Sequence, residues 1–174
     1  MKRFVGLATL VLLVAGMTLG PVWAQAPAAS ATTTNGPEAL SPQELDELVG
    51  RIALYPDELV AIVLPASTYP LQIVQGARYL EKKKKNPELK PRKDWDTSVL
   101  GLLNYPQVVK TMNDDLDWTW KLGEAVVAQQ KDVMNSIQQV RARAYAAGNL
   151  VSNDKQVIVQ EKQTIIIKSP NPEV

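Results

Sequence analysis

The stretch DLDWTWKLGEAVVAQQKDVMNSIQQVRARAYAAG, residues 115–148, decides the fold of this 174-residue chain. Its apolar residues return at alternating intervals of four and three, which places them along one side of an α-helix. The members of this stripe are Val126, Val133, Ile137, Val140, Ala144 and Ala147, with Gln130 as the polar interruption. The helix is expected to begin near Asp115 and to end at Ala147, because Gly148 suits a helix terminus. We expect the stripe to pack on shorter helices of the same chain, and a coiled coil between chains is the alternative.

A short helix is predicted at the start of the region before this long one. Residues 41–44, Ser-Pro-Gln-Glu, have the pattern of a capping box, in which the Ser41 and Glu44 side chains each accept from the other's backbone N–H. Four apolar residues then follow at helical spacing, namely Leu45, Leu48, Val49 and Ile52. This first helix is expected to end before Pro56.

The dipeptide Tyr-Pro recurs at residues 55–56, 69–70 and 105–106. Each proline suits the first turn of a new helix, because that turn leaves N–H groups unpaired and proline has none. The expected helices are 56–67, 70–84, 96–103 with Asp96 as its cap, and 106–113. A binding platform made of the three tyrosines is the functional alternative to this role as helix boundaries.

Apolar spacing also predicts which side of each short helix is buried. The predicted inward residues are Leu59, Ile62, Val63 and Ala66 in the helix at 56–67, and Leu71, Val74, Ala77 and Tyr79 in the helix at 70–84. Pro65 lies inside the first of these helices, where it removes a backbone hydrogen bond. A kink or an early end is therefore expected at Pro65.

After Gly148 the pattern changes to short β-branched runs at 156–160 and 164–168, which predict a β-hairpin. An isolated hairpin is marginally stable in water, so it is expected to pack on the helices, pair with more chain, or stay loose. The predicted fold class is therefore mainly α: a bundle of short helices packed on one long C-terminal helix, followed by a small β-hairpin.

The N-terminal segment has the layout of a secretory signal peptide. Met1, Lys2 and Arg3 precede an apolar run that is too short to span a bilayer, and Ala24 ends the best cleavage site. The predicted organisation is a signal peptide at 1–24, a flexible linker at 25–40, a helical domain at 41–149, and the hairpin with a tail at 150–174. The mature protein is expected to be periplasmic or secreted and not an integral membrane protein, and without cysteine it cannot carry a lipid anchor.

The amino-acid composition excludes several kinds of metal site, catalytic site and partner. The chain has no cysteine and no histidine, which excludes a thiolate zinc site, a cysteine nucleophile and a Ser-His-Asp triad. Lys and Arg number 19 against 18 Asp and Glu, a balance that does not suit a general nucleic-acid binder. We expect no cofactor and no nucleic-acid partner.

One segment is strongly basic. Residues 78–93 hold eight basic residues against two acidic ones, a net charge of +6. The basic residues are Arg78, Lys82, Lys83, Lys84, Lys85, Lys90, Arg92 and Lys93. Such a patch in an exported protein suits anionic lipid, lipopolysaccharide or an acidic envelope protein, and the alternative is a solvated helix end whose lysines complement the helix dipole.

Trp95 is a candidate interfacial anchor or a core residue. Trp118 and Trp120 point about 200° apart on one helix, and Trp120 is expected to be the exposed one.

Acidic residues supply weaker candidates for chemistry. Asn113, Asp114, Asp115 and Asp117 could offer oxygen ligands to calcium, but the glycine of a calcium loop is missing, so helix capping is preferred. A cell-wall hydrolase would need positioned carboxylates, for which the candidates are Glu44, Asp57, Glu58, Asp117 and Glu124.

Several segments together resemble one known family. They are IALYPDELVAIVLPASTYP, ARYL and WDTSVLGLLNYPQVVKTMNDDLDWTWKLGEAVVAQQKDVMNSIQQVRARAYAAGNL. From about Leu45 to Pro172 the chain resembles the bacterial exported family called domain of unknown function 3300. The resemblance implies location and fold and brings no established activity. Pro65 stands where the family pattern has a long apolar residue, and the family continues beyond Pro172, so the chain is expected to be a short member or a truncated form.

The expected function is a non-catalytic, exported interaction or structural module of the bacterial envelope. One alternative is peripheral binding of anionic lipid or lipopolysaccharide through residues 78–93. A second alternative is a carboxylate-dependent cell-wall hydrolase.

Overall fold

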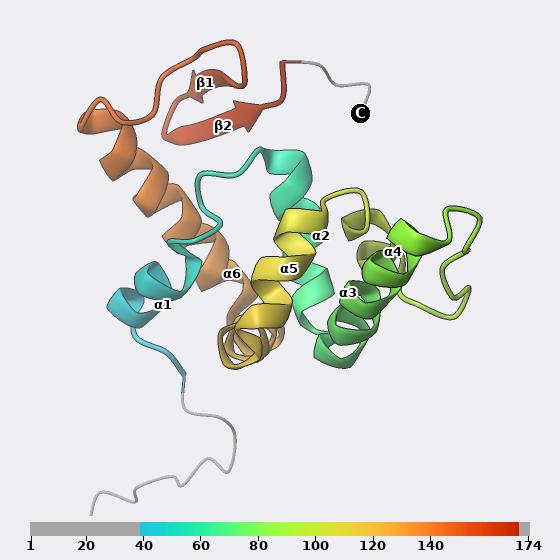
Figure 1. The fold of residues 1–174 in the computed structure, drawn as a ribbon. Helices are drawn as coiled ribbons and strands as arrows, with labels where there is room; N and C mark the ends of the chain where they lie inside the picture. Colours follow the sequence, from blue (N-terminus) through green and yellow to red (C-terminus); the bar gives the residue numbers. More distant parts are fainter. Residues whose placement is uncertain (1–38, 171–174) are drawn as a thin grey trace, which may run out of the picture. The chain divides into compact units, whose positions relative to one another are not determined.

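The computed structural model describes residues 39–170, which form six helices and one two-stranded sheet (Figure 1). The elements are α1 (Pro42–Val49), α2 (Asp57–Ser67), α3 (Pro70–Lys85), α4 (Thr97–Leu102), α5 (Pro106–Asp114), α6 (Leu116–Ala146), β1 (Val157–Glu161) and β2 (Thr164–Lys168). The predicted mainly helical fold, with short helices packed on a long one and a hairpin after it, is confirmed. The predicted signal peptide and nearly all of the predicted linker lie outside the described residues.

The long helix α6 forms the centre of the packing. Asp115 caps it by accepting a hydrogen bond from the Trp118 N–H at 3.1 Å, and Gly148 follows its end with a φ of +73°. Val133 and Ile137 of the predicted stripe lie in the core of the same chain, where α1 and α2 pack against α6. The stripe therefore packs within the chain, as preferred over a coiled coil between chains.

The expectation of an unbroken long helix is wrong at Gln129. Its backbone leaves helical geometry, with φ −138° and ψ 39°, so α6 is kinked there. The Gln129 side chain accepts from the Leu40 N–H at 2.8 Å and donates to the Leu40 carbonyl at 3.0 Å. This pair of bonds ties the chain entering α1 to the kink. Two positions of the predicted stripe are exposed: Gln130, its polar interruption, and Ala147, its last member.

The predicted helix starts are confirmed, except that Pro56 stands one position before the first turn of α2, as its N-cap residue. Ser41 and Glu44 form both hydrogen bonds of the capping box, and Asp96 caps α4 through the Ser98 N–H at 2.9 Å. Pro70 and Pro106 stand in the first turns of α3 and α5. Helix α1 ends at Val49, and the buried Ile52 belongs to the turn that follows it.

Two expectations about α2 and α3 need correction. Helix α2 passes through Pro65 and ends two residues later at Ser67, in agreement with the predicted range 56–67. Of the kink and the early end expected at Pro65, the early end does not occur. The carbonyl that Pro65 leaves unpaired belongs to Ala61, an exposed residue, so water can hydrate it. Leu71 was expected in the core, yet it is 68 % exposed. It precedes the buried Ile73 by two residues, or about 200° around the helix, and so faces away from the core.

Helices α2 and α6 cross without space for a side chain at Gly123. A Cβ atom on Gly123 would lie 2.4 Å from the Ser67 carbonyl oxygen. Glycine is therefore required for the close approach.

Among residues 39–170 no single helix is long and apolar enough to cross a membrane. Helices α2 and α3 reach that length and apolarity only together, and they meet at a bend of 114°.

The predicted hairpin is confirmed, with Glu161 opposite Thr164 and a turn at residues 162–163. Lys162 in this turn has a φ of +57°. Leu150, Ile165 and Ile167 form a second, smaller core against α6, and β2 also contacts α2. Of the three outcomes left open for the hairpin, packing on the helices is the one observed.

Candidate binding surface

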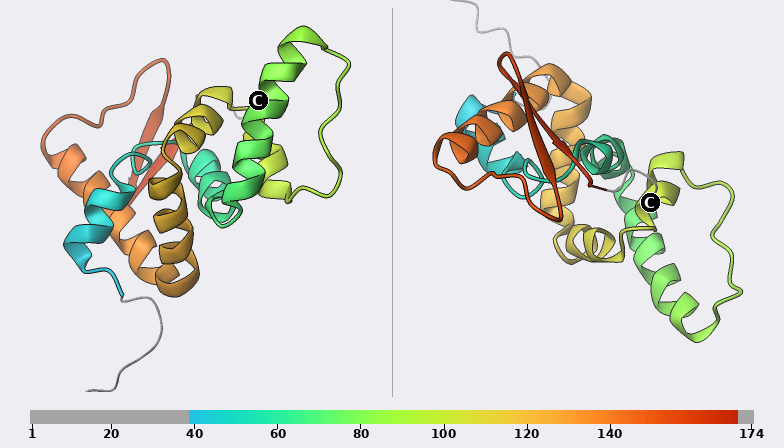
Figure 2. Two further views of the ribbon diagram at one scale, coloured as in Figure 1. Left: turned by 60° about the horizontal axis from the view of Figure 1, so that its bottom comes forward. Right: turned by 90° about the horizontal axis from the view of Figure 1, so that it is seen from above.

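The eight basic residues of segment 78–93 lie together at one end of the helical unit, on the second half of α3 and the loop that follows it. All eight are exposed. Figure 2 shows the end of α3 and its loop extending away from α6 and the hairpin. We call these eight residues the basic surface: Arg78, Lys82, Lys83, Lys84, Lys85, Lys90, Arg92 and Lys93.

Few of these cations are paired. Lys84 contacts Glu81 at 2.7 Å and Arg92 contacts Asp94 at 2.6 Å. Lys83 lies over the ring of Tyr79, 5.7 Å from its centroid. The other five basic residues have no carboxylate within ion-pair distance in the part of the chain that the structure describes; they are Arg78, Lys82, Lys85, Lys90 and Lys93.

The two carboxylates that do pair stay ionised at neutral pH. A hydrogen bond from Lys84, together with its charge, holds the pKa of Glu81 below its ordinary value. A hydrogen bond from Arg92 lowers the pKa of Asp94 in the same way. Each carboxylate neutralises one cation, and the surface keeps a strong positive excess.

A pocket of about 360 Å³ opens between α3 and the loop within the basic surface. Four basic residues line it: Arg78 and Lys82 from α3, and Lys90 and Arg92 from the loop. The remaining lining residues are Gln75, Tyr79, Leu89 and Trp95. We call this hollow the basic pocket. Its walls are cationic on two sides, and most of the remaining lining is apolar or aromatic.

The aromatic lining of the basic pocket is held firmly. The Trp95 indole N–H donates to Gln75 Oε1 at 2.9 Å, and the Tyr79 hydroxyl donates to the Leu89 carbonyl at 3.0 Å. The two rings meet edge to face at 5.9 Å. Trp95 is only 7 % exposed, so it is a core residue that borders the pocket and not an exposed anchor. Every polar atom of the aromatic pair is satisfied, which leaves the ring positions fixed.

A second groove, of about 750 Å³, runs between α3 and α5. Val74, Leu80, Val109 and Leu116 contribute to its apolar part. Its charged residues include the ion pair of Glu81 with Lys84 and the ion pair of Lys110 with Asp114. These internal pairs leave this groove less positive than the basic pocket.

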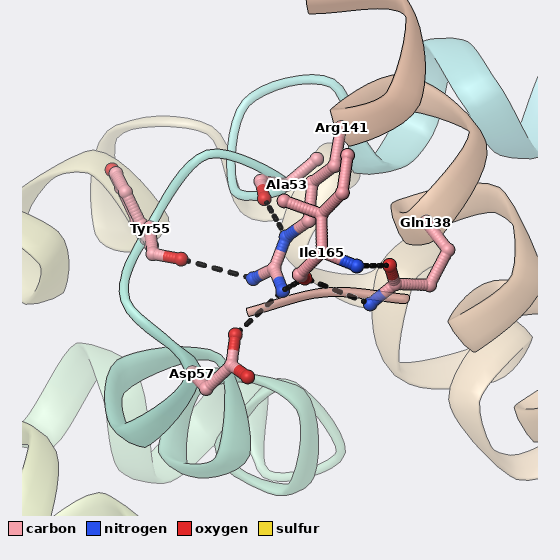
Figure 3. Close-up of polar contacts among 6 residues, drawn as sticks. All are labelled: Ala53, Tyr55, Asp57, Gln138, Arg141 and Ile165. Atoms are coloured by element: carbon pink, nitrogen blue, oxygen red, sulfur yellow. Dashed lines mark hydrogen bonds and ion pairs between the residues drawn. The ribbon is translucent and has the colours of Figure 1, made fainter. Parts of the chain in front are cut away.

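In contrast to the exposed basic surface, Arg141 of α6 is a buried cation (Figure 3). It is 2 % exposed and donates to the carbonyls of Ala53 at 2.7 Å, Tyr55 at 3.0 Å and Ile165 at 2.9 Å. It also pairs with Asp57 at 2.5 Å. The guanidinium group thereby joins three segments: α6, the turn that leads into α2, and strand β2.

Gln138, one turn before Arg141, completes the attachment of the strand. Its side chain accepts from the Ile165 N–H at 2.9 Å, and its amide donates to the Ile165 carbonyl at 3.4 Å. Figure 3 shows both side chains of α6 reaching the same residue of β2. The outer edge of β2 is thus covered at Ile165 by side chains of α6.

Comparison with known proteins identifies the family. The family model described as "Protein of unknown function (DUF3300)" matches residues 41–174. The chain belongs to the DUF3300 family. It is also 36 % identical over 136 residues to "Uncharacterized protein YacH" of Escherichia coli strain K12. That match covers 75 % of this chain and 22 % of the relative, so the chain spans about a fifth of the relative's length. No solved structure matches the chain.

Trp118 and Trp120 of this DUF3300 chain lie as their spacing predicts. Trp118 is buried and its indole N–H donates to the Leu48 carbonyl at 2.9 Å, and the Arg51 guanidinium carbon lies over the ring, 5.2 Å from its centroid. Trp120 is 54 % exposed. Nearby on α6, Val127 is 77 % exposed, and both residues line a shallow hollow beside Gly123. This apolar spot lies outside the basic surface.

The acidic run at residues 113–117 caps and pairs within the DUF3300 fold. Asp115 caps α6 and pairs with Arg51 at 2.7 Å, and Asp114 pairs with Lys110. The Arg51 hydrogen bond, followed by that from the Trp118 N–H, lowers the pKa of Asp115. The capping role preferred for this run is confirmed for Asp115. Residues 39–170 contain no group of three or more acidic side chains placed to hold a metal ion.

The five carboxylates considered for hydrolysis are distributed over α1, α2 and α6. Glu44 serves the capping box, where hydrogen bonds from Ser41 lower its pKa, and Asp57 serves Arg141. Asp117 stands in the first turn of α6, and Glu58 is exposed in the first turn of α2. Glu124 is half-buried beside the hollow at Trp120. No observation on these residues favours a hydrolase.

Sequence reasoning missed Arg141, although a signal was present. Arg141 follows Ile137 by four residues, so the two side chains share one face of α6. An arginine on an apolar helix face is unusual unless it is paired. The motif Leu-Tyr-Pro-Asp at residues 54–57 supplies two of the four partners, Tyr55 and Asp57, but their distance from Arg141 along the sequence hides the pairing.

Proposed function

We propose that this DUF3300 chain is a non-catalytic interaction module, exported to the bacterial envelope, that docks through its basic surface onto an anionic partner. The observation that carries this proposal is the set of five exposed, unpaired cations on the basic surface. Cations kept close together repel one another, so their concentration at one site costs stability unless an anion relieves it.

Export is part of the proposal. Residues 1–24 have the charged, apolar and small-residue sections of a signal peptide. An exported basic surface meets anionic lipid headgroups, lipopolysaccharide and acidic proteins, and each cation close to such a surface adds about 1 kcal/mol of attraction.

The test is cross-linking in intact cells that express the tagged full-length chain. An amine-reactive reagent reaches the lysines of the basic surface and also exposed lysines elsewhere, such as Lys121, Lys131 and Lys155. We expect links to envelope proteins to concentrate on residues 82–93, or the chain to co-sediment with envelope membranes and to be released by salt. Protein links identify an acidic protein partner, whereas salt-sensitive co-sedimentation without them identifies lipid.

A charge-matched pair of variants provides the control. Lys82→Gln with Lys85→Gln removes two cations from the basic surface, and Lys121→Gln with Lys131→Gln removes two from α6. The first pair is expected to weaken envelope association, and the second to leave it near the level of the unmodified chain. Links spread evenly over all lysines, together with recovery of the chain free of membranes, would overturn the proposal.

A further inference from the structure

The basic pocket is more specific than a patch of positive charge. Its α3 wall contributes Arg78 and Lys82, and its loop wall contributes Lys90 and Arg92. The charged residues that line it are all basic. An anion inside would therefore meet donors from two sides and no charged acceptor that repels it.

Three of the four basic residues that line the pocket have no acidic partner among the described residues. Arg78, Lys82 and Lys90 have no carboxylate within ion-pair distance among the described residues, while Arg92 shares its guanidinium group with Asp94. The Gln75 oxygen is already occupied by the Trp95 indole N–H, which turns the Gln75 side chain into a fixed part of the lining. What remains is a set of cationic N–H groups above a rigid aromatic base.

We infer that the basic pocket is a binding site for a phosphate ester. A phosphate group carries up to two charges and presents several oxygens in a tetrahedral arrangement, so cations on two walls can contact it at once. A carboxylate has two oxygens in one plane and suits a single guanidinium fork. The volume of about 360 Å³ also leaves room for the carbon atoms of the ester, against Tyr79, Leu89 and Trp95.

This inference rests on the proposed function, because it names the ligand chemistry of the same basic surface. The phosphate ester has two sources: the headgroup of a membrane lipid or a soluble phosphate compound. In both cases the recognising chemistry is the same. Vesicles and a soluble anion therefore have to be tested separately, because they distinguish the two sources.

The soluble arm uses the Trp95 indole N–H as a reporter, because it borders the pocket. Inorganic phosphate is titrated into the purified full-length chain while its indole N–H signals are followed by NMR, with acetate at equal ionic strength as the comparison. We expect the Trp95 signal to shift and saturate with phosphate, and to move little with acetate. The signals of Trp118 and Trp120 provide the internal control, because neither residue lines the pocket.

Two variants with equal charge separate the pocket from the rest of the surface. Arg78→Gln with Lys90→Gln removes one cation from each wall, whereas Lys85→Gln with Lys93→Gln removes two cations that do not line the pocket. We expect the first pair to weaken phosphate binding about tenfold or more and the second to change it less than about twofold. All four positions are exposed, so folding is unaffected in either pair.

The vesicle arm compares phosphatidic acid with oleate in phosphatidylcholine vesicles of equal surface charge. A pocket-dependent preference for phosphatidic acid identifies a lipid headgroup, whereas phosphate saturation without that preference identifies a soluble ester. Equal shifts with phosphate and acetate, or equal losses for the two variant pairs, would overturn the phosphate site while leaving the proposed function in place. Failure to bind phosphate or either vesicle, together with cross-links spread evenly over all lysines in intact cells, would overturn both.

Discussion

Arg141 and Arg78 carry the same guanidinium group in opposite surroundings. Arg141 is 2 % exposed and has three carbonyls and one carboxylate around it. Arg78 is exposed on α3 and has no carboxylate within ion-pair distance in residues 39–170. A charge that holds the fold together is satisfied by the chain itself. The cations that the chain leaves unsatisfied are therefore the ones available to another molecule.

The largest effect is expected at Arg141. Arg141→Met should lower the free energy of unfolding by about 3–5 kcal/mol, because three carbonyls lose their donor and Asp57 loses its partner. Chemical denaturation measures this loss, and amide exchange should become fast first in β1 and β2. Arg143→Met is the matched control: Arg143 lies on the same helix, is exposed and pairs with Asp46, and its loss should cost about 1 kcal/mol or less. Equal losses in the two variants would show that burial of the charge is unimportant.

A smaller loss of stability is expected from a substitution at Gly123, where α2 crosses α6. Gly123→Ala places a methyl group 2.4 Å from the Ser67 carbonyl oxygen, so the helices must separate. The expected cost is about 1–3 kcal/mol. Gly101→Ala is the control, because its Cβ would meet only Ile62 carbon atoms at 3.6 Å or more. In α4 that change should be neutral or stabilising by up to about 1 kcal/mol. Thermal unfolding of both variants gives the comparison directly.

Acidification is expected to lower the stability of the fold, because it protonates the carboxylates that cap its helices. The pKa values of Glu44, Asp96 and Asp115 are lowered in the folded state, chiefly by hydrogen bonds from Ser41, Ser98 and Arg51. A carboxyl group whose pKa is lower when folded stabilises the fold above its unfolded pKa, and this contribution is lost as the pH falls through the folded pKa. The urea concentration at the midpoint of unfolding should therefore decrease once the pH falls below the ordinary pKa values, which are 4.5 for Glu44 and 3.8 for the two Asp residues.

Asp115→Asn tests one of these caps. Asparagine can still accept from the Trp118 N–H, but it no longer titrates or attracts Arg51. The variant should therefore show a shallower decline in urea midpoint on acidification than the unmodified chain. An identical decline would remove Asp115 from the account of acid stability.

Local patterns allowed much of the fold to be predicted. The capping box at Ser41, the caps at Asp96 and Asp115, the Tyr-Pro helix starts and the β-branched runs of the hairpin each act within a few residues. The opposite orientation of Trp118 and Trp120 follows from helix geometry alone. Such features need no knowledge of distant parts of the chain.

What could not be predicted depends on distant residues. Gln129 bonds to Leu40, 89 positions away, and Arg141 bonds to Ala53, 88 positions away. The outward position of Leu71 depends on which side of α3 meets its neighbours. The basic residues were visible in the sequence, but the pocket exists only because the loop after α3 folds back beside it. Helical and alternating periods carry no information on these contacts.

The smallest effect on stability is expected at the basic surface. Lys82→Gln with Lys85→Gln should change the free energy of unfolding by no more than about 0.5 kcal/mol, because neither lysine has an ion-pair partner among the described residues. Chemical denaturation at neutral pH checks this value. A large decrease in the free energy of unfolding would mean that these lysines support the fold as Arg141 does, and the contrast between the two regions would not hold.

The most direct test of the central claim, that the unpaired cations serve an external anion, is the salt dependence of binding to vesicles that contain phosphatidylglycerol. The full-length chain and the Lys82→Gln, Lys85→Gln variant are compared from low salt, where the Debye length is about 30 Å, to high salt, where it is about 3 Å. We predict binding at low salt that declines with salt, and weaker, less salt-dependent binding by the variant. Binding that is absent at low salt, or identical for the two proteins, would contradict the account.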